Sequence, residues 1–243
     1  MIDQSILDFF KEVEKVRSEL RCSNSGVFYR GHSHKSHKLV PSLLRSNFSL
    51  TIEQNLYIES YARGRSLMNK SENSWEFLSI MQHYGIPTRL LDWSESLATA
   101  LFFALSDSYS EPQIWITNAF ELNKKNNITD VPKIITVGKD DLEDYEECFI
   151  SHVNTKSWKF DKPVFLQIPW TNERIINQKG FFTFHPNSTP MEDSCRKYVK
   201  CISIKKEAIP SLKRFLEYSG VGDDNIYADL ESFGKHLKKR YNV

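Results

Sequence analysis

Residues 83–94 read HYGIPTRLLDWS, and residues 97–105, which follow closely, read LATALFFAL. Gly85 and Pro87 interrupt the start of the first string, and the segment 88–92 after them predicts a strand. Ser94 or Ser96 is well placed to cap a helix over 97–105. Because that helix is apolar on nearly every side, we expect it to be central and buried.

Apolar spacing, capping residues and stop residues predict the other helices. They are expected over 3–20, over 52–69 with a capping box of Thr51 and Gln54, from a cap at Ser74 to a stop at Gly85, over 172–179 with a stop at Gly180, from Pro210 to Gly220, and through 226–241 behind Asp223 or Asp224. A short turn or helix is expected at Pro41, and an acidic helix over 141–155.

Short runs of β-branched and aromatic residues predict strands over 27–29, 114–116, 134–137, 164–168, 181–184 and 198–204. Strands separated by helices of irregular length are typical of an α+β fold, not of a regular βαβ series. We therefore expect a compact core made of a mixed sheet with flanking helices. We expect one domain over 1–243, with a helical N-terminal arm at 1–22 and an α+β core at 23–243.

Composition and charge describe an ordinary globular chain. Its 243 residues include 32 Lys and Arg against 31 Asp and Glu, so the chain has no overall positive charge of the kind that indicates binding to nucleic acid. No apolar run approaches the roughly 20 residues that span a bilayer, and the first residues do not resemble a signal peptide. These features predict a cytoplasmic protein that does not bind a membrane. The scattered Cys22, Cys148, Cys195 and Cys201 are expected to be reduced thiols.

Two clusters of polar residues stand out in the first half of the chain. Arg30 and Gly31 close the strand at 27–29, where a guanidinium fork suits a phosphate and glycine allows a ligand to approach. The alternative is a surface arginine. In the string 83–94, buried charges are costly unless paired, so Arg89 and Asp92 are expected to have partners, and they are able to pair with each other as a clamp. Trp93 has a second interpretation as a core residue.

Two further clusters have a structural and a functional interpretation. Gln178 precedes Gly180 and an aromatic strand, so it projects either into a cleft or simply from a helix C-terminus. His32, His34 and His37 offer a metal-chelating pair, but no nearby Asp, Glu or Cys completes a ligand set, so we expect no metal. The sequence has no GxSxG, HExxH, Walker or GxGxxG motif.

Several strings in this chain together resemble the FRG domain. They are 28–31 (FYRG), 39–45 (LVPSLLR), 83–94, the segment from Arg174 through Phe182, and the tail from Gly220 to Leu230, in which Ala228 replaces a common proline. The resemblance covers about residues 26–237 and implies an FRG-type protein.

The order of these strings is also similar to the layout of ADP-ribosyltransferases. That similarity implies a fold of the same type and NAD as a substrate, with Arg30 on a phosphate of NAD. Asp92, Trp93 and Ser94 would flank the nicotinamide ribose, and Gln178 would fall near the usual catalytic glutamate. We assign Asp92 and Gln178 as catalytic, and we assign the following as nucleotide-binding: Arg30, Gly31, His83, Arg89, Trp93, Ser94 and Arg174.

Gln178 departs from the pattern of those transferases because it carries no charge. Cleavage of NAD builds positive charge on the ribose, which a carboxylate stabilises. Either Asp92 or Glu173 supplies that carboxylate, or the protein binds a nucleotide without cleaving it.

Three functions follow as hypotheses. The first is an NAD-using ADP-ribosyltransferase or an NAD-cleaving protein, acting as a bacterial toxin or anti-phage effector on a protein or nucleic-acid acceptor. The second is a non-enzymatic nucleotide- or nucleic-acid-binding module with Arg30, Arg89 and Arg174 on phosphates. The third is a partner-binding protein with an exposed aromatic patch made of Trp75, Trp115, Trp158 and Trp170.

Overall fold

A computed structural model describes residues 4–22, 26–45, 49–68, 71–106, 111–126, 133–140, 142, 144–146, 160–170 and 173–241. Its centre is a seven-stranded sheet with the order β4-β5-β6-β2-β1-β3-β7. In chain order the strands are β1 (Val27–His32), β2 (Leu90–Ser94), β3 (Gln113–Asn118), β4 (Ile135–Thr136), β5 (Val164–Gln167), β6 (Gly180–Phe184) and β7 (Val199–Ser203). Neighbouring strands run antiparallel except β4 and β5, which are parallel, so the predicted mixed sheet is confirmed.

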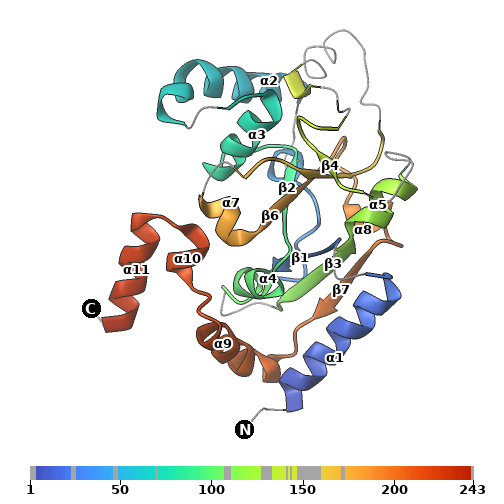
Figure 1. Cartoon of the computed structure of the whole chain (residues 1–243), viewed down its shortest axis with the longest axis vertical. Helices are drawn as coiled ribbons and strands as arrows, with labels where there is room; N and C mark the ends of the chain where they lie inside the picture. Colours follow the sequence, from blue (N-terminus) through green and yellow to red (C-terminus); the bar gives the residue numbers. More distant parts are fainter. Residues whose placement is uncertain are drawn as a thin grey trace.

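Helices flank this sheet, as the sequence predicts, and the N-terminus is helical (Figure 1). They are α1 (Gln4–Glu19), α2 (Leu50–Glu59), α3 (Ser74–His83), α4 (Leu97–Ala104), α5 (Ala119–Lys125), α7 (Glu173–Gln178), α8 (Met191–Ser194), α9 (Ile209–Tyr218), α10 (Asp223–Tyr227) and α11 (Leu230–Tyr241). A helix with the length and apolar character for crossing a membrane does not occur among the described residues.

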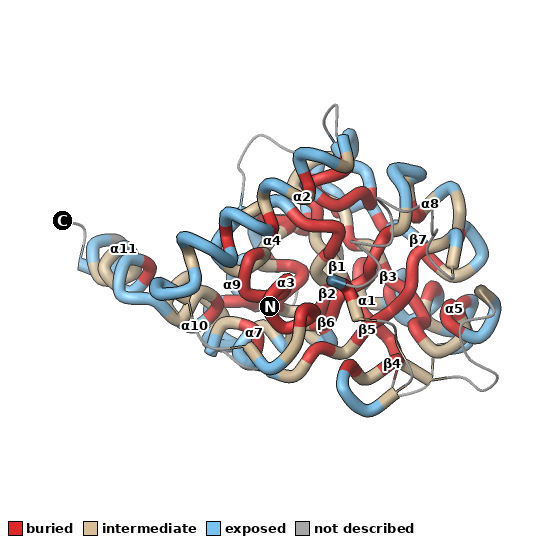
Figure 2. The backbone as a smooth tube through the Cα atoms, turned by 90° about the horizontal axis from the view of Figure 1, so that it is seen from above, coloured by how far each residue is buried: buried red, intermediate tan, exposed pale blue. Residues whose placement is uncertain are grey.

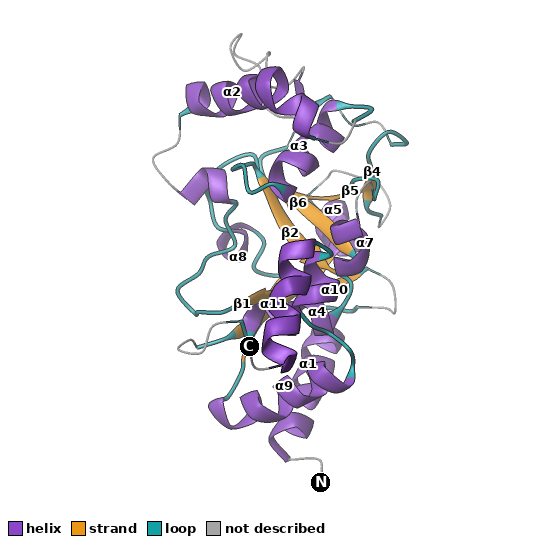
Figure 3. Cartoon of the chain, turned by 90° about the vertical axis from the view of Figure 1, so that its left-hand side faces the viewer, coloured by secondary structure: helices purple, strands orange, loops and turns teal. Residues whose placement is uncertain are grey.

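One face of the sheet carries two separate hydrophobic cores. Helices α1, α4 and α9 pack over β1, β3 and β7, and α2, α3 and α7 contribute to a second core over β2, β4, β5 and β6. On the opposite face, α5 and α8 contribute to a third core, which includes residues of β1, β2, β5 and β6. The buried residues lie at the centre of the molecule, and the helices lie around the strands (Figures 2 and 3).

The sheet is weakly joined where the two cores meet. Six register pairs join β1 to β3, but a single pair, Tyr29 with Ser94, joins β1 to β2. A strand pair with so few partners diverges on at least one side of its contact, because each further register position would add ladder hydrogen bonds. The boundary between the two halves of the sheet therefore lies between β1 and β2.

Several predicted element boundaries are corrected by the structure. Strand β1 continues through His32, so Arg30 and Gly31 lie within it and not at its end. The N-caps are Ser49 for α2 and Asn73 for α3, in place of the predicted Thr51 box and Ser74, while Ser96 caps α4. A cap is chosen by where the chain turns into the helix, and a neighbouring Ser or Thr in the sequence gives the same signal.

The C-terminal half brings further corrections. Lys179 takes the left-handed conformation (φ 46°) after α7, so Gly180 begins β6 and does not act as the helix stop. The predicted single closing helix is wrong, because Ala228 at φ 53° separates α10 from α11. Most of the predicted helix at 141–155 lies outside the described residues. Helices α5 and α8 are short and were not predicted from the sequence.

Arg89 pairs with Glu53 of α2, not with Asp92, at the entry to β2. Its Nε and Nη2 donate to the two carboxylate oxygens of Glu53 at 2.7 Å each, and its Nη1 donates to the carbonyl of Pro186 at 2.7 Å. Tyr145 adds a hydroxyl donor to Glu53 at 2.6 Å. Both charged side chains are almost fully buried, at 5% and 3% exposure, so this pair ties α2 to the central sheet.

Arg89→Ala is expected to lower the free energy of unfolding by about 3–5 kcal/mol, because it leaves the Glu53 carboxylate buried and unpaired. Urea denaturation of the parent and the variant measures this. Arg63→Ala is the matched control, since Arg63 pairs with Glu59 on the surface at 83% and 65% exposure and should change stability by less than about 1 kcal/mol. An Arg89→Ala protein with the parent midpoint would show that the pair does not stabilise the fold.

Gly31 marks the closest approach of α4 to the sheet. A Cβ at this position would lie 1.9 Å from the carbonyl oxygen of Ala100 and 2.7 Å from the amide nitrogen of Ala104. Both atoms belong to the backbone of α4, so no change of rotamer relieves the clash. The glycine is required because helix and strand touch there.

Gly31→Ala is therefore expected to destabilise the protein by at least the 1–3 kcal/mol typical of overpacking. Gly234→Ala is the matched control, because Gly234 lies in α11 with no atom within 4 Å of an added Cβ and should gain up to about 1 kcal/mol of helix propensity. Thermal melting of both variants gives the comparison. Equal melting temperatures for Gly31→Ala and the parent would mean that α4 packs less tightly than described.

Candidate functional site

A cavity of about 320 Å³ lies at the boundary between β1 and β2, with α3, α4, α7 and β6 contributing to its walls. It is lined by most of the predicted site residues, which come from distant parts of the chain: Arg30, Gly31, His83, Asp92, Trp93, Ser94, Arg174 and Gln178. Arg89 is not among its lining residues, because it is engaged with Glu53. The predicted strings therefore do meet in space, while the roles of their residues stay predictions.

Arg30 connects the two halves of the sheet across the cavity. Its Nη1 donates to the main-chain oxygen of Asp92 at 2.6 Å and lies 3.6 Å from the carboxylate of the same residue. The side chain is 18% exposed. Burial lowers the pKa of Arg30, the Asp92 carboxylate raises it, and the positive charge of Arg45 lowers it further. An arginine keeps its proton under these conditions, so Arg30 is a fixed cation in the wall.

His32 stands behind Arg30 and receives two donors. Arg30 Nε lies 3.1 Å from His32 Nε2, and Trp115 Nε1 lies 3.1 Å from His32 Nδ1. A neutral imidazole accepts at only one nitrogen, so only one of these contacts is a hydrogen bond at a time. Burial, followed by the charge of Arg30, lowers the pKa of His32 to about 3. His32 therefore accepts either from the Nε–H of Arg30 or from the indole N–H of Trp115, and not from both.

The carboxylate of Asp92 faces the cavity, and the side chains of Gln82 and Thr88 orient it. Gln82 Nε2 donates to Asp92 Oδ2 at 3.0 Å, and Thr88 in turn donates from its hydroxyl to Gln82 Oε1 at 2.6 Å. The Asp92 side chain is 50% exposed. Gln82 was not predicted as a site residue, although it directly precedes the string 83–94. Glu173, the other predicted source of charge, is exposed and is not among the lining residues.

Three predicted residues have their polar groups satisfied by the protein. Ser94 Oγ donates to the main-chain oxygen of Gln178 at 2.6 Å, and the side-chain amide of Gln178 donates to the main-chain oxygen of Ile226 at 3.1 Å. Trp93 is 2% exposed and donates from its indole to Thr183 at 3.0 Å. Trp93 therefore packs as a core residue, and Gln178 links α7 to α10.

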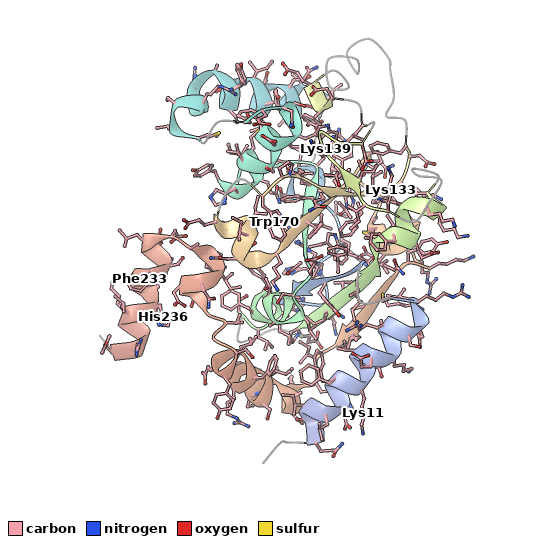
Figure 4. The ribbon with its side chains drawn as sticks, in the orientation of Figure 1. Lys11, Lys133, Lys139, Trp170, Phe233 and His236 are labelled. Atoms are coloured by element: carbon pink, nitrogen blue, oxygen red, sulfur yellow. The ribbon has the colours of Figure 1, made fainter. Side chains whose placement is uncertain are left out.

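Arg174 and His83 form the wall of the cavity near α10. The guanidinium of Arg174 lies 5.1 Å from the ring centroid of Tyr227. Burial and the charge of Arg174 lower the pKa of His83, whose buried Nδ1 has no hydrogen-bond partner among the residues that the structure describes. In the same region Trp170 lies beside α7 and donates from its indole to the main-chain oxygen of Gly180 at 2.9 Å (Figure 4).

The charge of the described lining residues is unbalanced. Three arginines, Arg30, Arg45 and Arg174, line the cavity with Asp92 as the single carboxylate. Such a wall suits an anionic ligand, and guanidinium groups match phosphate geometry. The ring centroids of His32 and His34 lie 5.8 Å and 6.1 Å from that of His37. Among the described residues, no group of three His, Cys, Asp or Glu side chains is placed to hold a metal.

The predicted aromatic patch is not formed. Trp75 is 3% exposed within the core under α3, and Trp115 is partly buried against His32. Trp170 is exposed, and Trp158 lies outside the described residues. Trp75 belongs to α3 and packs in the second core, whereas Trp115 belongs to β3 and packs against the third core, so the two side chains do not share a surface.

Comparison with known proteins gives one match. The family profile described as the FRG domain matches residues 25–113, which include the strings 28–31, 39–45 and 83–94. Neither a curated protein nor a solved structure matches the chain. The string around Arg174 and the tail lie beyond the matched segment, although β5, β6 and β7 from that part complete the same sheet. The chain therefore contains a segment, residues 25–113, that matches the FRG domain.

Proposed function

We propose that the cavity binds NAD and that the protein cleaves its nicotinamide–ribose bond, either as an ADP-ribosyltransferase or as an NAD glycohydrolase. The observation that carries this proposal is the meeting of Arg30 with the oriented carboxylate of Asp92 in one cationic cavity. The volume of about 320 Å³ falls at the lower end of the range of roughly 300–1,000 Å³ that small-ligand sites occupy.

The chemistry assigns separate roles to the two residues. In the reaction the bond between ribose C1′ and the nicotinamide nitrogen breaks, nicotinamide leaves with the bonding electrons, and positive charge develops on the ribose. Water or a nucleophile of an acceptor then bonds to C1′ and loses a proton. A fixed carboxylate stabilises the developing positive charge electrostatically, which is the role we give to Asp92. Arg30 binds a phosphate through two parallel hydrogen bonds.

A second candidate is a module that binds a nucleotide or nucleic acid without cleaving it. It is favoured by the hydrogen bonds of Ser94 and Gln178, because both side chains donate to main-chain oxygens of the protein. The proximity of Arg30 also neutralises part of the charge of Asp92. Release of nicotinamide from NAD, followed over time, separates the two candidates.

The cellular role is an extension of the first candidate. We propose action in the bacterial cytoplasm, as a toxin or an anti-phage effector, on a protein or nucleic-acid acceptor. This role rests on the resemblance to transferases. The cationic cavity and the carboxylate within it support this role.

Arg30→Lys is expected to weaken NAD binding at least tenfold, because an ammonium group does not reproduce the two parallel bonds of a guanidinium to phosphate. The melting temperature should fall only slightly, since a lysine retains a donor for the main-chain oxygen of Asp92 and a single hydrogen bond contributes about 1 kcal/mol. Isothermal titration calorimetry measures the affinity. Lys35→Ala is the control, because Lys35 pairs with Glu111 on the surface and is not a lining residue. Unchanged affinity in Arg30→Lys would remove Arg30 from the site.

Asp92→Asn is expected to lower the rate constant for nicotinamide release by about 10²–10³-fold with little change in KM, as for removal of a group that stabilises developing charge. Gln82→Leu should give a smaller loss of the same kind, because the carboxylate remains but one of its two contacts is gone. Single-turnover assays at saturating NAD give these rates. Release at the parent rate by Asp92→Asn would exclude a catalytic role for this carboxylate.

A further inference from the structure

The cavity continues into a second hollow. That hollow has a volume of about 360 Å³ and is lined by residues of the segment 36–45 and by Ser188. His37 and Arg45 line both spaces, so they stand at the junction between them. The two spaces therefore adjoin at these two side chains.

Arg45 is held at this junction without an acidic partner. It ends the short 3₁₀-helix Ser42–Arg45, and its Nε donates to the main-chain oxygen of Val40 at 2.8 Å. Among the described residues, no carboxylate forms an ion pair with its guanidinium. The hydrogen bond to Val40 therefore fixes the fork, while the terminal nitrogens remain available to a ligand.

The hollow beside Arg45 is cationic. Lys38 lines it together with Arg45, and no acidic residue is among its described lining residues. Lys38 lies 3.8 Å from a carboxylate oxygen of Glu192, which leaves the Arg45 charge without compensation. The charge of Arg45 also reaches the first cavity, where it lowers the pKa of both Arg30 and His32. Two guanidinium groups within electrostatic range repel each other, and an anion bound between them offsets that repulsion.

We propose that Arg45 forms a second phosphate subsite, so that the ligand of this protein is a dinucleotide with two linked phosphates and not a mononucleotide. One phosphate binds Arg30, the next binds Arg45, and the second nucleoside extends into the hollow at residues 36–45. The proposal rests on the proposed function, because it requires a nucleotide in the first cavity.

The test compares NAD with nicotinamide mononucleotide, which carries one phosphate, on the parent protein and on Arg45→Gln. Calorimetry should show the parent binding NAD at least tenfold more tightly than the mononucleotide. Arg45→Gln should lose about tenfold in NAD affinity and a clearly smaller factor in mononucleotide affinity. Gln keeps an amide donor for Val40, and Arg45 is exposed, so the variant is expected to fold, which its melting temperature checks. Arg65→Gln, an exposed arginine whose guanidinium packs over Tyr61, is the matched control.

The outcomes separate this inference from the proposed function. NAD binding that depends on Arg45 without nicotinamide release supports the subsite and overturns catalysis. Equal losses for both ligands, or none, in Arg45→Gln overturn the subsite while leaving the proposed function in place. If neither nucleotide binds the parent, both proposals fall. Binding of a single-stranded oligonucleotide through Arg45, with no binding of NAD, would overturn the dinucleotide in favour of nucleic acid.

Discussion

The hydrogen bond from Arg30 to the main-chain oxygen of Asp92 joins two strands that share a single register pair. A continuous ladder between β1 and β2 would satisfy these backbone groups by itself and would leave no space at the sheet surface. Here a side chain supplies the donor, so β1 and β2 stay connected while the helices on either side pack over separate cores. The cavity is the space between those cores, and the third core on the opposite face, which includes residues of both strands, holds the halves together.

The rest of the structure fixes the two sides of this boundary independently. On one side α4 rests against β1 at Gly31, where the backbones touch. On the other side Arg89 binds Glu53 and the carbonyl of Pro186, which anchors α2 to β2 and to the end of β6. Arg89 is thus a buried cation with a complete set of partners, as the cost of burying charge requires. The contrast with the cavity is informative, because three arginines there face one carboxylate. The lining residues leave that excess of positive charge unbalanced, so binding of an anion explains it better than stability does.

The sequence predicted the strands of the sheet and the segments that line the cavity. It predicted less well which contacts the individual side chains make. Strings such as 83–94 indicated which segments carry polar side chains, and periodicity indicated which segments form strands and helices, although several of their ends were wrong. The role of Gly31 was not predictable, because it depends on Ala100 and Ala104, about seventy residues away along the chain. Arg89 was expected to find an acid, but the choice of Glu53 over the nearby Asp92 depends on how α2 packs. The break at Ala228 was hidden because an alanine in the left-handed conformation gives no local signal, in contrast to a glycine.

Asp92 has two separable functions in this arrangement, and the separation bears on what the cavity is able to do. Its main-chain oxygen accepts from Arg30, while its carboxylate receives Gln82 from the side of α3. The structural contact therefore does not use the carboxylate, which stays half exposed and oriented. If the carboxylate only balanced the charge of Arg30, the main-chain contact and the ion pair would be enough to hold Arg30. The hydrogen bonds from Thr88 to Gln82 and from Gln82 to Asp92 would then have no purpose at the cavity. A site needs such an orienting pair of side chains when a carboxylate must already have a fixed orientation before a ligand binds. The free energy of reorganisation is then a cost of folding and not of the reaction.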